Sequence, residues 1–150
     1  MNATHGSPLT TTQKRLVRES FDSMQEYETS VVVLFYGRLF EIAPETRALF
    51  KIDIREQSRK LMDTLRTTVD SLDHFTKLSP VLEELGRKHL TYGVQDYHYE
   101  KLRSALLWAI GQALGLEFDR DTRAAWDELL SAISSIMLNG AAQSHPVCRD

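Results

Sequence analysis

The chain has 150 residues, of which 42% are hydrophobic and 26% are charged, with a formal net charge of −3 and a pI near 6.0. This length suits one domain with a full hydrophobic core, and this composition excludes a disordered protein. The 18 Lys and Arg residues are scattered in short clusters, so nucleic acid is a poor candidate partner. We expect one folded domain over residues 9–142, between flexible tails at 1–8 and 143–150.

The N-terminal residues contain neither a basic nor an apolar segment, so they do not resemble a secretory signal. The longest apolar run, Val31 to Tyr36, is far too short to span a bilayer. The single cysteine, Cys148, cannot form a disulfide within the chain, which fits a reducing compartment or carries no information. We expect a soluble cytoplasmic protein with no membrane partner.

Hydrophobic residues recur at helical spacing along the whole chain, and no alternating strand pattern persists. Thr10 and Gln13 have capping-box spacing and predict the start of a first helix. A second apolar helix is expected to end at Pro44, followed by a short helical turn up to Phe50 and a third helix from about Arg55. The residues expected to face inward on these helices include Leu16, Val17, Phe21, Met24, Val31, Val32, Phe35, Tyr36, Leu39, Phe40, Gln57, Leu61, Leu65 and Leu72.

Ser79 and Pro80 predict the start of a fourth helix, with Ser79 capping the first turn and Pro80 at the first helical position. Residues three and four apart share a face of a helix. The face expected here contains Val81, Leu82, Leu85 and His89. A long apolar helix is then expected to end at Gly115, and a last helix begins near residues 119–121. Six or seven helices without a sheet give the all-α class.

His89 is the residue in this pattern that carries the most chemistry. An imidazole on an apolar helical face can be the lone protein ligand of an iron held by a planar cofactor. The alternative is a half-buried structural histidine bonded to a carbonyl. The sequence has no Gly-rich phosphate loop, no Glu-x-x-His pair on two helices, no His-Glu-x-x-His and no Cys-x-x-Cys. Of the sites considered, an axial ligand in an apolar pocket is the one that remains.

Four segments carry a resemblance to a known family: VLFYGRLFEIAPETRALF at 33–50, EQSRKLM at 56–62, LGRKHLTYGV at 85–94, and Ala125-Trp126. The chain resembles single-domain bacterial haemoglobins and the haem domain of flavohaemoglobins, with some likeness to neuroglobin-type sequences. The resemblance covers about residues 9–140. It implies an all-α globin fold of six to eight helices around a haem pocket, with haem b as cofactor and dioxygen as ligand.

The resemblance also assigns roles to individual residues. It makes His89 the proximal iron ligand, and the carbonyl of Leu85 is the nearest acceptor for its second nitrogen. Tyr36 and Gln57 become distal residues that donate hydrogen bonds to dioxygen, with Leu61 over the same position. Further contacts with the cofactor are expected from Phe50, Lys60, Leu61, Val94 and Tyr99, with Lys60 pairing with a propionate. Of the remaining histidines, His74, His98 and His145 are expected at the surface.

Two departures from the flavohaemoglobin pattern bear on function. The position of a glutamate that acts on the proximal histidine falls at about Ala141, and the sequence ends without a reductase region. We therefore expect reversible dioxygen binding, for transport or storage, with nitric oxide and carbon monoxide as further ligands. The alternative is a nitric oxide dioxygenase that uses a separate reductase. A non-haem helical interaction module is a third hypothesis, and a sensor is the least favoured. The oligomeric state is not predicted.

Overall fold

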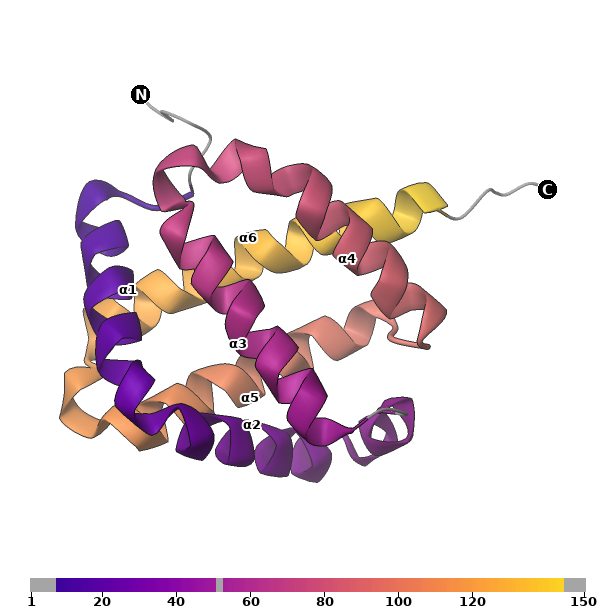
Figure 1. The fold of residues 1–150 in the computed structure, drawn as a ribbon, viewed down its shortest axis with the longest axis horizontal. Coiled ribbons are helices and arrows are strands. Elements are labelled where there is room, and N and C mark those ends of the chain that lie inside the picture. Colours follow the sequence, from indigo (N-terminus) through magenta and orange to yellow (C-terminus); the bar gives the residue numbers. More distant parts are fainter. Residues whose placement is uncertain (1–7, 51–52, 145–150) are drawn as a thin grey trace.

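The computed structural model describes residues 8–50 and 53–144, and within these ranges it contains helices and no strand, as predicted. The described residues form six α-helices and four short 3-10 helices (Figure 1). The α-helices are α1 (Thr11–Met24), α2 (Glu28–Ile42), α3 (Ile54–Asp70), α4 (Ser79–Thr91), α5 (Asp96–Leu114) and α6 (Arg120–Ser144). The 3-10 helices are η2 (Gln25–Tyr27), η3 (Pro44–Leu49), η4 (Leu72–Leu78) and η5 (Gly115–Glu117).

Most of both expected tails, together with His145 and Cys148, lies outside the described residues. At the C-terminal side α6 continues to Ser144, two residues beyond the expected domain boundary.

The predicted helix boundaries are set by local hydrogen bonds. The capping box of α1 is confirmed: the Gln13 backbone N–H donates to Thr10 Oγ1 at 3.1 Å, and the Thr10 N–H donates to Gln13 Oε1 at 3.0 Å. Asp53 caps α3 by accepting a bond from the Arg55 N–H at 3.1 Å. Gly115 ends α5 with a φ of +58°, a conformation that glycine adopts without steric cost.

Three local predictions are wrong. Ser79 does not cap α4, because η4 runs directly into α4 and leaves Ser79 with helical dihedral angles, φ −53° and ψ −49°. Leu72 lies in η4 rather than in the third helix, although it is buried as predicted. Val81 is 59% exposed, because the buried face of α4 is centred on Leu82.

The closest helix packing brings α4 against α6, and α2 packs mainly against α5. A Cβ added to Gly86 of α4 would lie 1.9 Å from the Met137 carbonyl oxygen of α6. A Cβ added to Gly140 of α6 would lie 2.2 Å from the Glu83 carbonyl oxygen of α4. The two helices thus meet backbone to backbone, which only glycine at both positions allows. In Figure 1, α4 crosses the C-terminal half of α6, and α3 crosses in front of α5 and α6.

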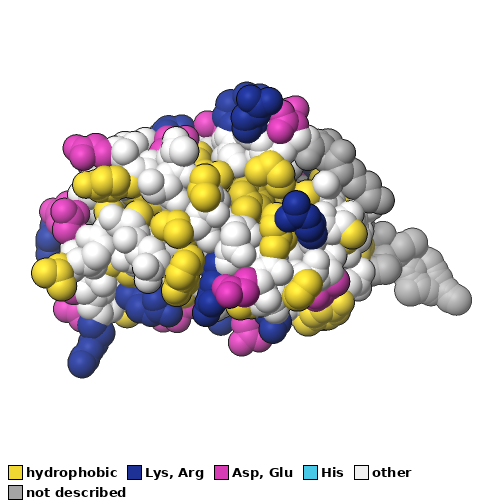
Figure 2. All heavy atoms as spheres, turned by 90° about the horizontal axis from the view of Figure 1, so that it is seen from below, with side chains coloured by type: hydrophobic (Ala, Val, Ile, Leu, Met, Phe, Trp, Pro, Cys, Tyr) yellow, Lys and Arg dark blue, Asp and Glu magenta, His cyan; other side chains and the backbone are white. Residues whose placement is uncertain are grey.

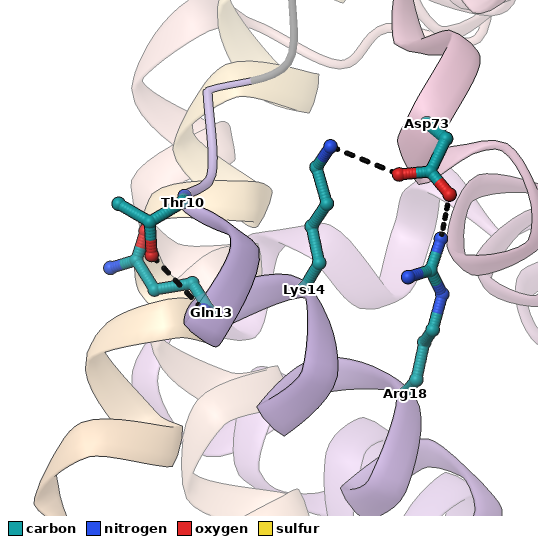
Figure 3. Close-up of polar contacts among 5 residues, drawn as sticks. All are labelled: Thr10, Gln13, Lys14, Arg18 and Asp73. Carbon is teal, nitrogen blue, oxygen red and sulfur yellow. Dashed lines mark hydrogen bonds and ion pairs between the residues drawn. The ribbon is translucent and has the colours of Figure 1, made fainter.

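Polar contacts connect α1 to the rest of the molecule. Lys14 Nζ and Arg18 Nη2 each lie 3.0 Å from a different carboxylate oxygen of Asp73 in η4 (Figure 3). In the core, the indole N–H of Trp126 on α6 donates to Ser20 Oγ on α1 at 2.8 Å, so a fully buried tryptophan has its polar atom satisfied.

In the part of the chain that is described, no helix combines the length and the apolar character needed to cross a bilayer. Seen from below, the face that includes α2 carries hydrophobic side chains between scattered charges of both signs (Figure 2).

Candidate functional site

His89 lies near the end of α4 with its ring half-buried. Its Nδ1 is 2.8 Å from the Leu85 carbonyl oxygen, as predicted. Because a carbonyl can only accept, Nδ1 carries the proton and Nε2 keeps its lone pair. Burial lowers the pKa of His89, and the bond to Leu85 opposes this in part. The imidazole is therefore held neutral with its orientation fixed, which is the form that binds a metal ion.

Tyr36 on α2 is only 6% exposed and lies in a cluster of rings that we call the distal aromatic cluster: Tyr36, Phe40 and Phe50. Its ring centroid is 5.3 Å from that of Phe50 and 4.8 Å from that of Phe35, both in edge-on arrangements. Burial raises the pKa of Tyr36 to about 12, and a hydrogen bond with the Ser58 side chain offsets part of the rise. At neutral pH the hydroxyl keeps its proton and can donate it.

The N-terminal half of α3 contains three of the residues expected at the site. Gln57 and Leu61 are half-buried, and Leu61 packs against the core. Within the described part of the chain, the Gln57 side chain makes no hydrogen bond to a protein group. Lys60 is exposed, and its Nζ lies 3.8 Å from Glu56 Oε2. Of the predicted α3 residues, Gln57 and Leu61 therefore border the interior, whereas Lys60 lies at its edge.

Two further predicted residues follow α4. Val94 is half-buried and its backbone N–H donates to the His89 carbonyl oxygen at 3.0 Å, so the loop after α4 folds back onto the histidine. Tyr99 on α5 is 6% exposed, and burial raises its pKa to about 12. It lines a cavity of about 250 Å³ between α5 and α6, together with Arg103 and Ser135.

A larger groove of about 540 Å³ lies between α3 and α4. Its lining includes Thr64 from α3, and Leu82, Leu85 and Lys88 from α4, but neither His89 nor any residue expected to contact the cofactor or its ligand. No group of three or more His, Cys, Asp or Glu side chains in residues 8–50 and 53–144 is arranged to hold a metal ion. The neutral, oriented imidazole of His89 fits a planar cofactor whose iron needs one protein ligand.

One predicted surface residue is buried. His98 is 3% exposed, whereas His74 is exposed as predicted. The Gln95 backbone N–H donates to His98 Nδ1 at 2.9 Å, and His98 Nε2 lies 3.4 Å from Glu45 Oε2 in η3. His98 is buried because it forms a capping box with Gln95 in the first turn of α5, and this turn lies against η3. The spacing of Gln95 and His98 was the sequence signal for this role.

Sequence reasoning also missed Ser58. Its hydroxyl donates to the Ile54 carbonyl oxygen at 2.7 Å, and its side chain lowers the pKa of Tyr36, against the larger rise caused by burial. A serine inside a helix gives no sequence signal for such a contact, because its usual role is the local bond to the preceding turn.

Comparison with known proteins identifies the family of this fold. The globin family model matches residues 33–137. Neuroglobin from Tetraodon nigroviridis is 28% identical over 150 aligned positions, covering 91% of this chain and 94% of neuroglobin. An anaerobic nitrite reductase from Oryza sativa subsp. indica is 29% identical, with 87% of this chain and 97% of that protein covered.

Two solved structures share the fold. An engineered carbene transferase made from a nitric oxide dioxygenase-like protein of Rhodothermus marinus has a TM-score of 0.81 and 28% identity, covering 90% of this chain and 94% of that chain. A bacterial globin from Campylobacter jejuni has a TM-score of 0.79 and 20% identity, covering 89% and 97%. The family model spans well over half of the sequence and the fold agrees throughout, so this chain belongs to the globin family.

Proposed function

We propose that this globin is a haem protein that binds dioxygen reversibly for transport or storage, with haem b between α3 and α4 and His89 as the axial iron ligand. Membership of the globin family supports a haem-based, oxygen-binding role in general. The observation that carries the proposal for this chain is the 2.8 Å contact from His89 Nδ1 to the Leu85 carbonyl, which leaves Nε2 as the atom able to bind iron. The haem iron supplies the position at which dioxygen binds.

The distal side of the pocket is assigned to Tyr36 and Gln57. Tyr36 keeps its proton because burial raises its pKa to about 12, and Gln57 has an amide with no protein partner among the described residues. Both can donate to dioxygen, whose bound form accepts hydrogen bonds more strongly in a dry pocket than in water. Each such bond contributes about 0.5–1.5 kcal/mol, so each slows dioxygen release up to about tenfold.

The remaining predicted residues complete the cofactor site. Phe50 and Leu61 would contact the porphyrin from the distal side, and Val94 and Tyr99 would contact its proximal side and edge. Lys60 would exchange its exposed partner Glu56 for a propionate, which adds little binding energy because both groups are solvated.

The first experiment tests cofactor and coordination. Absorption spectra of the reduced protein are recorded under argon, air and carbon monoxide, for the wild type and for His89→Ala. We expect a strong band near about 400 nm that shifts with each gas, and its loss or a changed axial ligand in His89→Ala. A coloured His89→Ala protein with an unaltered iron–ligand signature in resonance Raman would refute the assignment of His89.

The second experiment tests the distal assignment. Tyr36→Phe is expected to release dioxygen about tenfold faster in stopped-flow measurements, because one hydrogen bond to the ligand is lost. Tyr97→Phe is the matched control, since Tyr97 is 59% exposed and its substitution should leave the rate unchanged. Equal rates for wild type and Tyr36→Phe would remove Tyr36 from the mechanism.

A nitric oxide dioxygenase is the second candidate function. It is favoured by the similarity to the structure from Rhodothermus marinus, which covers 90% of this chain. It would use the same Tyr36 and Gln57 pocket, with electrons from a separate donor. Ala141 stands where flavohaemoglobins are expected to carry a glutamate, which weakens the case for oxygen–oxygen bond cleavage. Sustained conversion of nitric oxide to nitrate with a physiological electron donor would establish this function in place of the first.

A further inference from the structure

The segment between α4 and α5 lies against η3. A Cβ added to Gly93, whose φ is +99°, would lie 3.1 Å from Leu49 Cδ2 in η3. Gly93 precedes Val94, which we assign to the proximal side of the cofactor, and Leu49 precedes Phe50, which we assign to the distal side. Residues assigned to opposite sides of the cofactor are thus joined, at one edge of the proposed pocket, by neighbours that lie close together.

A second contact between the same two segments joins His98 to Glu45. His98 Nδ1 accepts a hydrogen bond from the Gln95 N–H at 2.9 Å, so the neutral imidazole carries its proton on Nε2. This Nε2 is buried and makes no hydrogen bond within the described residues. The Glu45 carboxylate of η3 faces it, with Oε2 at 3.4 Å, in an electrostatic contact that lacks hydrogen-bond geometry.

The two partners differ in their exposure to solvent. The side chain of Glu45 is 53% exposed, whereas that of His98 is 4% exposed. A pair of two solvated groups contributes little to stability. Here one group is desolvated, and withdrawal of the carboxylate would leave a buried N–H with neither water nor an acceptor, which is costly. The contact therefore favours the arrangement in which η3 and α5 stay together.

The segment that carries this contact is also tied to the proposed iron ligand. The Val94 N–H donates to the His89 carbonyl oxygen at 3.0 Å, at one end of the segment. At its other end the ring of Tyr97 packs on the imidazole of His98, with 4.3 Å between the ring centroids. A displacement of His98 from Glu45 would therefore loosen the residues between α4 and α5.

We propose that Glu45 and His98 form a latch that closes one edge of the pocket, and that the opening of this latch sets the rate at which the cofactor leaves. This inference rests on the proposed haem-binding function. Neither residue has to contact the cofactor, because the latch acts through the positions of Val94 and Phe50. Both are positioning residues: they hold together two segments that belong to opposite walls.

The latch itself is tested by amide hydrogen exchange of the intact protein, followed by mass spectrometry. Glu45→Ala removes the carboxylate and leaves the capping box of Gln95 and His98 in place. We expect peptides from residues 92–98 to exchange about three- to tenfold faster, the equivalent of one hydrogen bond. Glu41→Ala is the control, since Glu41 is exposed and pairs with Arg38 within α2 at 3.0 Å. Unchanged exchange in Glu45→Ala, or an equal increase in Glu41→Ala, would overturn the proposal.

A second variant separates the latch from the capping box. In His98→Asn the amide oxygen can still accept from the Gln95 N–H, but the shorter side chain does not reach Glu45. Adding Glu45→Ala to His98→Asn should therefore give no further increase in exchange, and an additive increase would refute the pairing. Glu45→Gln keeps an oxygen acceptor at the same length and should restore exchange close to the wild-type rate. It provides the informative comparison if His98→Asn does not fold.

The consequence for the cofactor is measured as the rate of haem transfer to an excess of a haem-free acceptor globin. We expect Glu45→Ala to raise this rate by about three- to tenfold and Glu41→Ala to leave it unchanged. Faster hydrogen exchange with an unchanged rate of haem transfer would refute the role of the latch in cofactor retention. A wild-type protein without a haem band would instead refute the proposed function, whereas hydrogen exchange would still report the contact of Glu45 with His98.

Discussion

The two sides of the pocket are built in different ways. The proximal wall, formed by α4 on α6, is fixed by backbone contact at Gly86 and Gly140, where a side chain would overlap a carbonyl. The distal wall, formed by the distal aromatic cluster and the first half of α3, depends on contacts between rings. Backbone contact has no alternative geometry, whereas rings can adjust. Under the proposed function, we therefore expect the proximal wall to fix the position of His89 and the distal wall to be where ligand affinity is tuned.

The largest expected effect tests the rigidity of the proximal wall. In Gly86→Ala the new Cβ would lie 1.9 Å from the Met137 oxygen, so α4 must move away from α6. We expect the free energy of unfolding in urea to fall by about 3 kcal/mol, as in severe overpacking. Gly37→Ala is the control, because its Cβ meets nothing within 4 Å. It should be neutral or slightly stabilising. Similar losses in both variants would contradict the comparison.

The second effect compares the two buried tyrosines, one on each side. The pKa of Tyr36 and of Tyr99 is about 12, above the usual 10.0. The unfolded chain therefore ionises first, so the stability held below pH 10 is lost as pH rises toward 12. Each tyrosine should account for at most about 2.7 kcal/mol of this loss. Urea unfolding of Tyr36→Phe and Tyr99→Phe should show a shallower fall over this range. If the unfolding free energy of either variant depended on pH as it does in the wild type, the tyrosine replaced in that variant would be hydrated in the folded protein.

The third effect tests the ring contacts of the distal wall. Phe50→Leu removes two edge-on contacts, with Tyr36 at 5.3 Å and Phe40 at 5.6 Å, and keeps most of the apolar volume. We expect a loss of about 1 kcal/mol in the free energy of unfolding. Phe118→Leu is the control, since Phe118 is also half-buried and contacts no ring of the cluster. A loss of the same size at Phe118 would mean that volume, not ring geometry, sets the effect.

The smallest expected effect concerns the ion pairs that hold η4, the segment between α3 and α4, against α1. Asp73 lies in η4, which joins α3 to α4, and its ion pairs with Lys14 and then Arg18 lower its pKa. The stabilisation is therefore present above the usual pKa of 3.8 and is lost as pH falls through the lower pKa of the folded protein. Asp73→Asn should lower the urea midpoint slightly at neutral pH, and about 1 M salt should remove the difference.

Glu19→Gln provides the matched control for Asp73→Asn. Glu19 pairs with Arg15 within α1 at 3.3 Å, and both side chains are more than half exposed. Its substitution should leave the midpoint unchanged. An equal shift in the two variants would mean that general surface charge, rather than the contact between η4 and α1, is responsible.

Much of the fold could be predicted from local sequence patterns. The capping box of Thr10 and Gln13, the end of α5 at Gly115 and the His89–Leu85 bond all involve residues within four positions of each other, so spacing alone predicts them. The errors arose where neighbouring elements meet. Ser79 lost its cap because η4 continues into α4, and His98 is buried because α5 packs on η3. Such junctions depend on contacts between distant segments, which helical periodicity does not report.

The sequence by itself determined the all-α class, the order of the helices and the family to which the chain belongs, because these follow from hydrophobic periodicity and from motifs in register. Only the tertiary structure decided that Gly86 and Gly140 meet the opposite helix backbone, and that Tyr36 packs edge-on against Phe50. The physical reason is distance along the chain. A carbonyl more than fifty residues away, or a ring in another element, becomes a neighbour only when the core has packed.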